Sequence, residues 1–479
     1  MNHETPSLSG LPRGPATFLP SLLRYLVDPY GVFHALARKY GDPFLFPIPG
    51  TRGSVVTTSP EGVEAVISAD RDQFVPLVTE ATHQLFGESS IFLQGGADHR
   101  QARKIMTPPF HAHRLAEHGA IMEAIARRHM AGWRAGDVVA MHGVAHQMTL
   151  DIILRVLFGI GPADRDRLQR FHAALDDGLD ALGPAILYTR PLRRRFGGFG
   201  PWSRALRLVD DLRAALMAEI AHHRARGAAL PSGPSGDVLD SFIAARYDDG
   251  RPLTDLEIRD RLSDLIIGGH ETTAVAIAWA LYELCRSPEA MDRLVAELDA
   301  RWTGPDPRQL AAVPYLEAVC LETLRLHPSV VFLSRQLARP LVVLGYEVPA
   351  GMAISMALPV VHANPRVFPE PHRFRPERFV DRSYAPSEFL PFGGGHKRCM
   401  GAAFGLHEMK VTVATVLRGF RIALRHGHPT GARPRTITVA PRRGVDLVLV
   451  ERRAPATRRP VAVTPVETAS APSTGSAAR

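Results

Sequence analysis

A long, helix-patterned stretch between Thr254 and Cys285 constrains the fold of this chain more than any other feature. Thr254 and Glu257 have the spacing of a capping box, in which each side chain accepts a hydrogen bond from the other residue's backbone at the start of a helix. The apolar pattern then runs on to Cys285, and Ser287-Pro288 ends it. This predicts one helix of about 32 residues, roughly 48 Å long at 1.5 Å per residue. A helix of that length in a globular chain has to cross the whole core.

Shorter elements around that helix predict a fold that is mainly helical with a minor strand portion. Helical patterns extend over about 112–300 and return at about 315–326 and 401–417. Strand-like runs occur at 43–48, 53–58, 341–348 and 352–358. No repeat or linker divides the chain, so we expect one domain over residues 16–450. A flexible lead-in (1–15) precedes it, and a tail (451–479) with a composition typical of disorder follows it.

Composition excludes several classes of protein. Of the 479 residues, 45% are hydrophobic and 22% charged, which is ordinary for a globular protein. The net charge is +9, but we find no run of five or six Lys/Arg and no nucleic-acid-binding module. Nucleic acid is therefore not an expected partner. An acidic protein that docks on a basic face, or simply a basic solvated surface, accounts for the charge.

The cysteines and the termini indicate the compartment. Three cysteines, at 285, 320 and 399, form an odd and sparse set that excludes a disulfide scaffold and favours a reducing, cytoplasmic location. The N-terminal residues lack the pattern of a secretory signal. No stretch reaches the roughly 20 apolar residues that a membrane span requires.

The loop that leads to Cys399 is the most informative segment for function. Three adjacent glycines, Gly393 to Gly395, permit left-handed dihedrals and a close approach to a flat cofactor. Cys399 then stands at the predicted start of a helix, where the helix dipole and free N–H groups favour the metal-ligating thiolate. A single cysteine without a partner at zinc-ligand spacing favours a metal held by a macrocycle, such as haem iron. The alternative is a buried free thiol behind a packing loop.

A second unusual segment lies within the long helix. Gly268 and Gly269 cost about 1 kcal/mol each relative to alanine, which indicates that a ligand needs room on that face. The hydroxyl of Thr272 can disturb the i−4 bond and open a groove for dioxygen and water. Glu271 beside it provides a proton source for the reduction of O₂. A packing notch with a capping threonine is the alternative.

The segment 392–401 resembles the haem-binding loop of the cytochrome P450 family, which has the form F-x-x-G-x-[RH]-x-C-x-G. This chain departs from the pattern at Lys397, where the family usually has Arg or His. The resemblance implies haem b (iron protoporphyrin IX) and a triangular-prism fold built on a long central helix, with Cys399 as the metal ligand. Residues that it assigns to cofactor binding in this loop are Phe392, Gly393, Lys397, Cys399 and Gly401.

Three further segments resemble the family in the expected order, so that the resemblance covers about residues 11–450. The segment 268–273 resembles its oxygen-activation motif, with Glu271 and Thr272 as the proton-delivering catalytic pair. The segment 95–104 resembles its propionate-binding helix, with His99 and Arg103 one helical turn apart. Arg335 is a third candidate for the propionates.

Glu322, Arg325 and Arg378 resemble the structural Glu-Arg-Arg network that fixes the family's cysteine loop from behind. Glu322 and Arg325 are three residues apart on one helix and therefore lie side by side. The alternative is a surface ion pair, which is worth only tenths of a kcal/mol.

Asp264 occupies a position where the family often has an apolar residue or threonine. It shares a helix face with Gly268 and Thr272, so it is a candidate for substrate contact. The alternative, which we favour, is that it pairs with Arg261 or another cation.

The resemblance implies a monooxygenase that inserts one atom of O₂ into a small lipophilic molecule such as a terpenoid, fatty acid or polyketide, by hydroxylation or epoxidation. No flavin or iron–sulfur domain fits in this length, so electrons must come from a ferredoxin or flavodoxin with its NAD(P)H-dependent reductase. We expect a monomer. A peroxide-driven enzyme of the same fold and a non-catalytic haem sensor or carrier are the alternatives. The basic residues expected to meet the electron donor are Arg100, Lys104, Lys397, Arg398 and Lys410.

Overall fold

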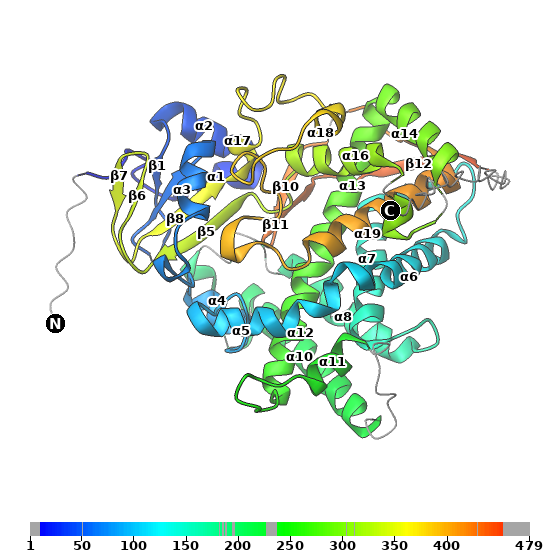
Figure 1. Ribbon diagram of the computed structural model, residues 1–479, viewed down its shortest axis with the longest axis horizontal. Coiled ribbons are helices and arrows are strands. Elements are labelled where there is room, and N and C mark those ends of the chain that lie inside the picture. Colours follow the sequence, from blue (N-terminus) through cyan, green and yellow to red (C-terminus); the bar gives the residue numbers. More distant parts are fainter. Residues whose placement is uncertain are drawn as a thin grey trace, which may run out of the picture.

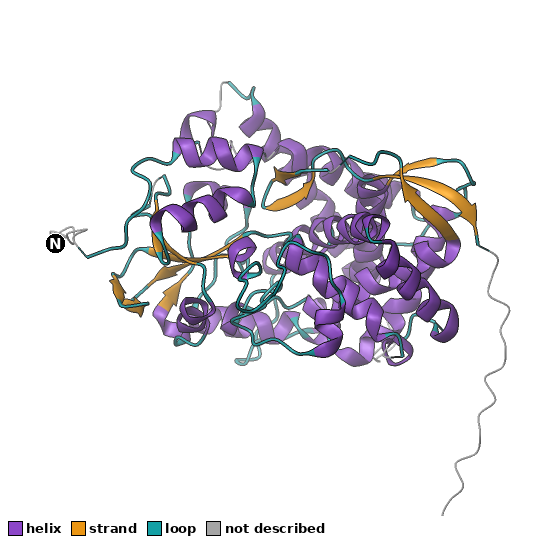
Figure 2. Ribbon diagram, turned by 90° about the horizontal axis from the view of Figure 1, so that it is seen from above, coloured by secondary structure: helices purple, strands orange, loops and turns teal. Residues whose placement is uncertain are grey.

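Helices dominate the structure, and most strands gather at two separate parts of it (Figures 1 and 2). The structure is a computed structural model that describes residues 10–453, except residues 50, 182, 184–185, 187–188, 194–196, 227–236, 303, 311 and 429. The prediction of a mainly helical fold with a minor strand portion is confirmed. Most of the predicted lead-in and nearly all of the predicted tail lie outside the described residues.

The helices follow the chain in three groups. The first group is α1 (Leu19–Val27), α2 (Gly31–Tyr40), α3 (Pro60–Ile67), α4 (Glu80–Leu85) and α5 (Gly96–Met106). The second is α6 (Ala112–Met130), α7 (Met141–Phe158), α8 (Arg165–Ala181), α10 (Pro201–Arg226) and α11 (Val238–Ala244). The third is α12 (Asp255–Gly269), α13 (Glu271–Arg286), α14 (Pro288–Arg301), α15 (Pro307–Leu310), α16 (Pro314–Leu326), α17 (Leu358–Val361), α18 (Glu377–Asp381) and α19 (Ala402–Gly419).

The strands form one larger sheet and three small ones. The five-stranded sheet has the order β1 (Phe44–Phe46), β2 (Ser54–Thr57), β8 (Ala353–Ala357), β5 (Phe332–Leu337) and β3 (Phe74–Val75). The three-stranded sheet has the order β4 (Val138–Ala140), β12 (Asp446–Arg452) and β9 (Phe420–Leu424). The two hairpins are β6 (Leu341–Val343) with β7 (Tyr346–Val348), and β10 (Ala432–Arg435) with β11 (Thr438–Pro441).

The central helix is divided into α12 and α13 at His270, so the prediction of one uninterrupted helix is wrong at that residue. The His270 N–H reaches Ile266 O at a long 3.4 Å, while its ring Nδ1 donates to the same oxygen at 2.6 Å. The hydroxyls of the two threonines that follow Glu271 donate to Gly268 O and Gly269 O. Side chains thus take over carbonyls of the helical ladder, which is a recognised cause of a helix break.

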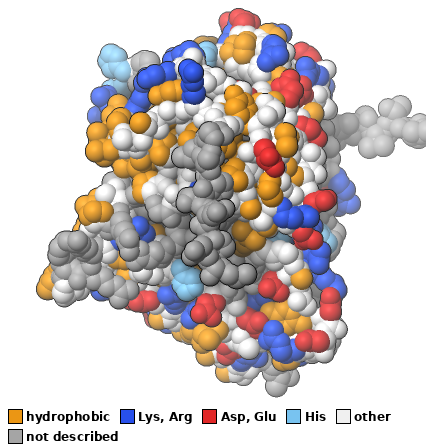
Figure 3. All heavy atoms as spheres, turned by 90° about the vertical axis from the view of Figure 1, so that its left-hand side faces the viewer, with side chains coloured by type: hydrophobic (Ala, Val, Ile, Leu, Met, Phe, Trp, Pro, Cys, Tyr) orange, Lys and Arg blue, Asp and Glu red, His pale blue; other side chains and the backbone are white. Residues whose placement is uncertain are grey.

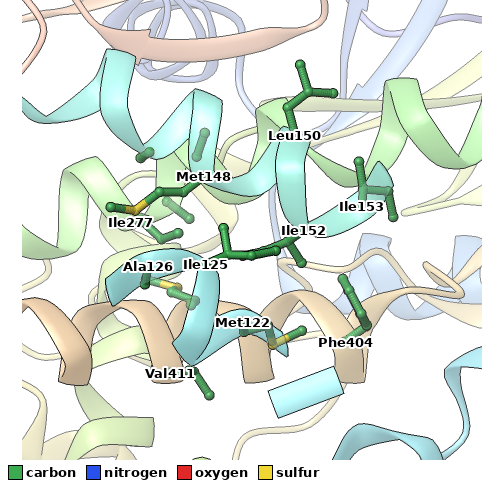
Figure 4. Packing of buried hydrophobic residues seen from close by; sticks show 14 of the residues in the cluster. Met122, Ile125, Ala126, Met148, Leu150, Ile152, Ile153, Ile277, Phe404 and Val411 are labelled. Atoms are coloured by element: carbon green, nitrogen blue, oxygen red, sulfur yellow. The ribbon is translucent and has the colours of Figure 1, made fainter. Parts of the chain in front are cut away.

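The main hydrophobic core lies where α6, α7, α13 and α19 pack together (Figure 4). Side chains from all four helices meet there, and they include Met122, Ile125, Met148, Ile152, Ile277, Phe404 and Val411. The helix that follows Cys399 is therefore anchored against the helix that carries Thr272. This packing fixes the two segments that the sequence singled out relative to each other.

The last strand extends two residues into the segment predicted as the tail. Strand β12 continues to Arg452, which pairs with Phe420 of β9 and places its guanidinium 4.9 Å from that ring's centroid. The register shifts between Leu449 and Glu451, as in a β-bulge. Such a bulge interrupts the strict alternation that marks a strand in the sequence.

The surface is mixed in charge where it can be seen. On the face that lies to the left in Figure 1, basic, acidic and hydrophobic side chains are interspersed (Figure 3). Where described residues are visible on this face, they form no continuous basic stripe of the kind that nucleic acid requires. Among the described residues, no helix combines the length and the hydropathy that crossing a bilayer demands.

Candidate functional site

The cysteine loop is folded tightly against the end of α3. Gly393 and Gly395 have left-handed φ angles of 69° and 61°. A Cβ atom at Gly394 would lie 2.8 Å from the side chain of Ile67, and one at Gly395 would lie 2.5 Å from Ile67 O. The Cys399 N–H donates to Phe392 O at 2.8 Å and closes the loop. The glycines are thus required by this turn and by its contact with α3.

The Cys399 thiol is exposed but closely surrounded by protein. Its side chain is accessible, yet desolvation by the surrounding protein raises its pKa. The Gly401 backbone N–H and the positive charges of Arg103 and Arg398 act in the opposite direction. An accessible but desolvated sulfur beside cations is suited to bind a cationic metal centre, which would replace the missing solvation of the thiolate.

Basic side chains gather beside this loop, and they come from four separate segments. Their members are Arg71, His99, Arg103, Arg335, His396 and Lys397. Burial, and then the neighbouring cations, lower the pKa of His99 to about 3 and that of Lys397 to about 8. Burial alone lowers the pKa of Arg335 to about 10. No carboxylate among the described residues therefore compensates the positive charge of this cationic cluster.

Backbone carbonyls accept hydrogen bonds from part of the cationic cluster. Arg103 donates to Arg398 O at 2.7 Å, and Lys397 donates to Gln94 O at 2.8 Å. Arg335 donates to Val66 O at 3.2 Å and to Gly394 O at 2.5 Å. Within the described part of the chain, none of these cations has an ion pair with a carboxylate, and the buried His99 Nδ1 has no hydrogen-bond partner. The cluster fits a flat cofactor that brings its own carboxylates, as haem does with its propionates.

The notch in the central helix borders α13, which packs against the helix that follows the cysteine loop. The Thr272 hydroxyl donates to Gly268 O at 2.8 Å, and a Cβ atom at Gly268 would meet nothing within 4 Å. On the adjacent face, a Cβ atom at Gly405 of α19 would lie 3.5 Å from Thr273 Oγ1. The helix that begins just after Cys399 therefore contacts the central helix at the residue next to Thr272.

Glu271 points away from this notch. Its side chain is only 2% exposed, whereas Thr272 is partly exposed. The carboxylate accepts a hydrogen bond from His146 Nδ1 at 2.7 Å and two from Arg435 at 3.2 and 3.3 Å, and His142 Nε2 lies 3.7 Å away. Burial by itself raises the Glu271 pKa, but the interactions with the two histidines and the Arg435 charge outweigh it and lower the pKa. The carboxylate is therefore ionised at neutral pH.

Sequence reasoning missed the partners of Glu271. His142 and His146 stand four residues apart, so they share one face of α7. That spacing could have indicated that the two histidines act on one common partner. Arg435, from β10, gave no signal because nothing near it in the sequence marks its contact with α13.

Among the described residues, Asp264 forms an ion pair neither with Arg261 nor with any other cation. Its carboxylate accepts hydrogen bonds from the Ser90 hydroxyl and the Ile91 N–H, both at 2.7 Å. Arg261 instead donates to Tyr247 Oη at 2.7 Å. The expectation that Asp264 forms an ion pair with Arg261 is therefore wrong, because Arg261 turns toward a different segment.

Glu322, Arg325 and Arg378 are brought together in a buried network. Arg325 donates to both Glu322 oxygens at 2.7 and 2.8 Å, and Arg378 donates to Glu322 Oε1 at 3.1 Å. The side chains are at most 5% exposed. Arg325 also donates to the carbonyls of His362 and Pro371, in the segment that leads to the cysteine loop.

The five basic residues expected at the electron-donor face differ in availability. Lys104 pairs with Asp248, and Lys410 pairs with Glu317 at 2.9 Å. Lys397 lies inside the cationic cluster. Arg100 and Arg398 remain exposed, and neither forms an ion pair with any described carboxylate.

Comparison with known proteins defines the class. The chain belongs to the cytochrome P450 family, whose model matches residues 11–445. Members of this family are monooxygenases of the oxidoreductase class and use haem b, so the predicted enzyme class and cofactor are confirmed.

Two groups of relatives are similar over most of their length. The chain is 34% identical over 450 residues to putative cytochrome P450 135B1 of Mycobacterium tuberculosis and Mycobacterium bovis, covering 92% of each chain. It is 33% identical over 458 residues to putative cytochrome P450 135A1 of Mycobacterium tuberculosis, covering 93% of this chain and 96% of the relative. The fold is similar to that of retinoic acid-bound cyanobacterial CYP120A1, with a TM-score of 0.79, 24% identity, and coverage of 91% and 99%.

Proposed function

We propose that this cytochrome P450 inserts one atom of O₂ into a lipophilic small molecule, by hydroxylation or epoxidation, with electrons from a separate protein. The observation that carries the proposal is the accessible Cys399 thiol, which lies beside an uncompensated cationic cluster. The packing of α19, which follows Cys399, against α13, which carries Thr272, supports a site that the cysteine loop and the helix notch form together. Incubation with isotopically labelled O₂, an electron donor and a substrate tests the proposal: one labelled atom per product supports it, and none contradicts it.

The cofactor-binding roles follow from the donor set. Cys399 would hold the iron through Sγ, with Phe392, Gly393 and Gly401 shaping the loop around it. His99, Arg103, Arg335 and Lys397 would bind the propionates by charge-assisted hydrogen bonds. Haem bound through a thiolate supplies the binding and reductive activation of O₂.

Glu271 and Thr272 act at different points of one proton route. The Thr272 hydroxyl gives its own proton to Gly268 O, which leaves its oxygen lone pairs available to a water in the notch. Glu271 is ionised and hydrogen-bonded to His146, so it receives a proton from the histidine side rather than storing one. Because the Glu271 carboxylate faces His142 and His146 rather than the notch, its side chain would have to rotate to carry a proton from these histidines to the notch.

Replacement of Thr272 by alanine tests this route. The variant is expected to consume NADPH at a similar rate but to form less product, because the notch would lack the hydroxyl whose lone pairs hold a water for proton delivery. Thr273→Ala is the matched control, since Thr273 makes the same type of bond, to Gly269 O at 3.1 Å, but lies against α19. Equal coupling in both variants would contradict the role of Thr272.

The expected substrate class follows from the segments around the notch. The segments expected to line the substrate cavity, 76–92, 264–272, 329–334 and 438–442, each contain a run of apolar residues, which favours a terpenoid, fatty acid or polyketide. A fifth segment, 180–188, lies largely outside the described residues. A screen of such compounds for a spin-state shift of the haem would identify the class, and binding only of polar, charged compounds would contradict it.

An acidic ferredoxin or flavodoxin is the expected electron donor, served by its NAD(P)H-dependent reductase. Arg100 and Arg398 are the exposed cations next to the cationic cluster, and they would pair with acidic groups of the donor. Arg100→Glu and Arg398→Glu should slow reduction by such a donor, most strongly at low ionic strength. Arg339→Glu, at an exposed cation near the hairpin of β6 and β7, is the control and should leave the rate unchanged. Equal rates in all three would exclude this docking site.

Two other functions of the same fold predict different behaviour. A peroxide-driven enzyme would turn over with hydrogen peroxide alone and gain nothing from a donor protein. A haem sensor or carrier would consume no NADPH in a substrate-dependent manner. The acid–threonine pair favours the O₂-dependent monooxygenase over both.

The three cysteines are unpaired, which supports a reducing compartment such as the cytoplasm. We expect a monomer, and sedimentation velocity tests this expectation.

A further inference from the structure

The segment from Gly87 to Gln94 is bound to the central helix by two buried carboxylates. Asp260 and Asp264 lie one turn apart on α12, and both are at most 5% exposed. The Ser89 N–H donates to Asp260 Oδ2 at 3.0 Å. The two bonds from Ser90 and Ile91 go to Asp264, which is 173 residues further along the chain than Ile91. Three hydrogen bonds thus join this segment, hereafter the 87–94 strap, to one face of α12.

The contact with Asp260 depends on a glycine. A Cβ atom at Gly87 would overlap the Asp260 carboxylate. Asp260 also accepts two hydrogen bonds from Arg259, at 2.9 and 2.6 Å, which hold its carboxylate toward the strap. Any side chain at position 87 would therefore displace either the strap or this carboxylate.

Every backbone N–H group of the 87–94 strap from residue 89 to residue 93 donates a hydrogen bond. Besides the two bonds to aspartates, the Ser90 N–H donates to Gly87 O and the Leu93 N–H donates to Ser90 O, both at 3.0 Å. The Phe92 N–H donates to the Ser90 hydroxyl at 3.3 Å. Removal of the aspartate oxygens would leave buried N–H groups without acceptors, which costs more than the bonds themselves.

The other end of the strap reaches the cysteine loop. Lys397 donates to Gln94 O at 2.8 Å, and helix α5, which carries His99 and Arg103, begins two residues later. The strap therefore runs from the central helix to the cationic cluster. Asp264 shares its helix face with Gly268 and Thr272, at one and two turns' distance. The strap thus lies next to the notch, along one side of the expected substrate cavity.

We propose that Asp260 and Asp264 are positioning residues that hold the 87–94 strap against α12 and thereby determine which substrates the cavity accepts. This proposal rests on the function proposed above. It assigns Asp264 no direct contact with substrate. The hydrogen-bonding capacity of Asp264 matters, and its negative charge does not.

The environment of Asp264 explains why charge is dispensable. Burial raises its pKa to about 7, against the opposing effect of the bonds from Ser90 and Ile91. When protonated, one oxygen can donate to the Ser90 hydroxyl while the other still accepts from the Ile91 N–H. Asparagine reproduces that arrangement, because its amide group donates to Ser90 and its oxygen accepts from Ile91. Alanine offers neither group.

Two variants of the holoenzyme therefore distinguish the hydrogen bonding of Asp264 from its negative charge. In Asp264→Ala, exchange of the Ser89 and Ile91 amides with deuterium should accelerate about tenfold or more, the factor that corresponds to about 1.4 kcal/mol. Affinity for 4-phenylimidazole should fall about fivefold or more, because binding must then order the strap. Affinity for imidazole, which is small enough to reach the iron without the strap, should stay within about twofold. Asp264→Asn should match the wild-type protein in all three.

Three further variants keep the test decisive if Asp264→Ala does not fold. Ser90→Ala removes one of the two bonds to Asp264 and should give an intermediate increase in exchange. Gly87→Ala should accelerate exchange of the Ser89 amide by displacing Asp260. Asp255→Ala is the control on the same helix, where the side chain makes only a partly exposed pair with Arg224, and it should change nothing.

The proposal is overturned if Asp264→Asn behaves like Asp264→Ala, which would indicate a role for the charge itself. It is equally overturned if Asp264→Ala and Ser90→Ala both keep wild-type exchange and the wild-type ratio of the two affinities. Amide exchange does not require chemistry at the haem. A wild-type protein that binds no haem but shows the predicted exchange pattern would therefore refute the proposed function and leave the strap contact intact.

Discussion

Replacement of Glu322 by alanine tests the buried Glu-Arg-Arg network directly. The Glu322 side chain is fully buried and accepts hydrogen bonds from Arg325, from Arg378 and from the Arg375 N–H. Its removal would leave two guanidinium groups buried without their shared anion. The Arg325 guanidinium would keep its bonds to His362 O and Pro371 O, at 2.8 Å each, but its positive charge would be uncompensated.

The expected loss of stability is large relative to that of a surface pair. Breaking a buried ion pair from one side costs about 3–5 kcal/mol. Total stabilities are about 5–15 kcal/mol, so at least about a fifth of the stability is at risk. Arg127→Ala provides the matched control, because Arg127 pairs with Glu123 one turn away but is 61% exposed. That exposed pair should contribute only about 0.3–0.5 kcal/mol.

Urea unfolding of both variants, followed by circular dichroism and by the haem absorption band, measures the difference. We expect Glu322→Ala to shift the midpoint strongly, and to lose the haem band before the helical signal because the network supports the segment that leads to the cysteine loop. A shift as small as that of Arg127→Ala would refute the argument. It would mean that water or local rearrangement compensates the two arginines.

Three further predictions concern the cavity, the helix cap and the propionates. Gly268→Ala should raise the unfolding free energy of the haem-free protein by about 1 kcal/mol, since the added methyl meets open space, and should weaken ligand binding in a spin-state titration; a loss of stability would contradict this. Burial raises the Glu257 pKa, but hydrogen bonds from Arg251, Tyr247 and Thr254 lower it to about 2. The contribution of Glu257 to folding stability is therefore complete above the ordinary pKa of 4.5 and is lost as the pH falls toward about 2. Glu257→Gln should flatten the pH dependence of the melting temperature between these two pH values, and an unchanged dependence would contradict this. Arg103→Gln should accelerate transfer of haem to a scavenging protein about tenfold, because a charge-assisted bond is worth about 1.5–3 kcal/mol; an unchanged rate would exclude a propionate contact.

Features that depend on a few neighbouring residues could be predicted from the sequence. The capping box is an example, since the Thr254 N–H donates to Glu257 at 2.7 Å and the Glu257 N–H donates to Thr254 at 3.3 Å. The start of α19 after the cysteine loop and the pairing of Glu322 with Arg325 are also local. In each case the partners lie within about one helical turn, so spacing alone defines the contact.

Features that depend on distant segments could not be predicted. The break at His270 is supported by α7, since the Thr149 hydroxyl donates to His270 O at 3.0 Å. Asp264 is held by residues far away in the sequence, and its neighbours gave no sign of them. The spacing of His142 and His146 indicates that they share a helix face, but their contact with Glu271 depends on how α7 packs against α13.

The absorption spectrum of the reduced, CO-bound protein tests the central claim most directly, and it should be recorded for the wild-type protein and for Cys399→Ala. The wild-type protein should show the red-shifted band of a thiolate-ligated haem, Cys399→Ala should lack it, and Cys320→Ala, at a buried thiol in the core, should keep it. A wild-type protein that takes up no haem, or a thiolate-type band that survives in Cys399→Ala, would contradict the assignment of Cys399 as the iron ligand.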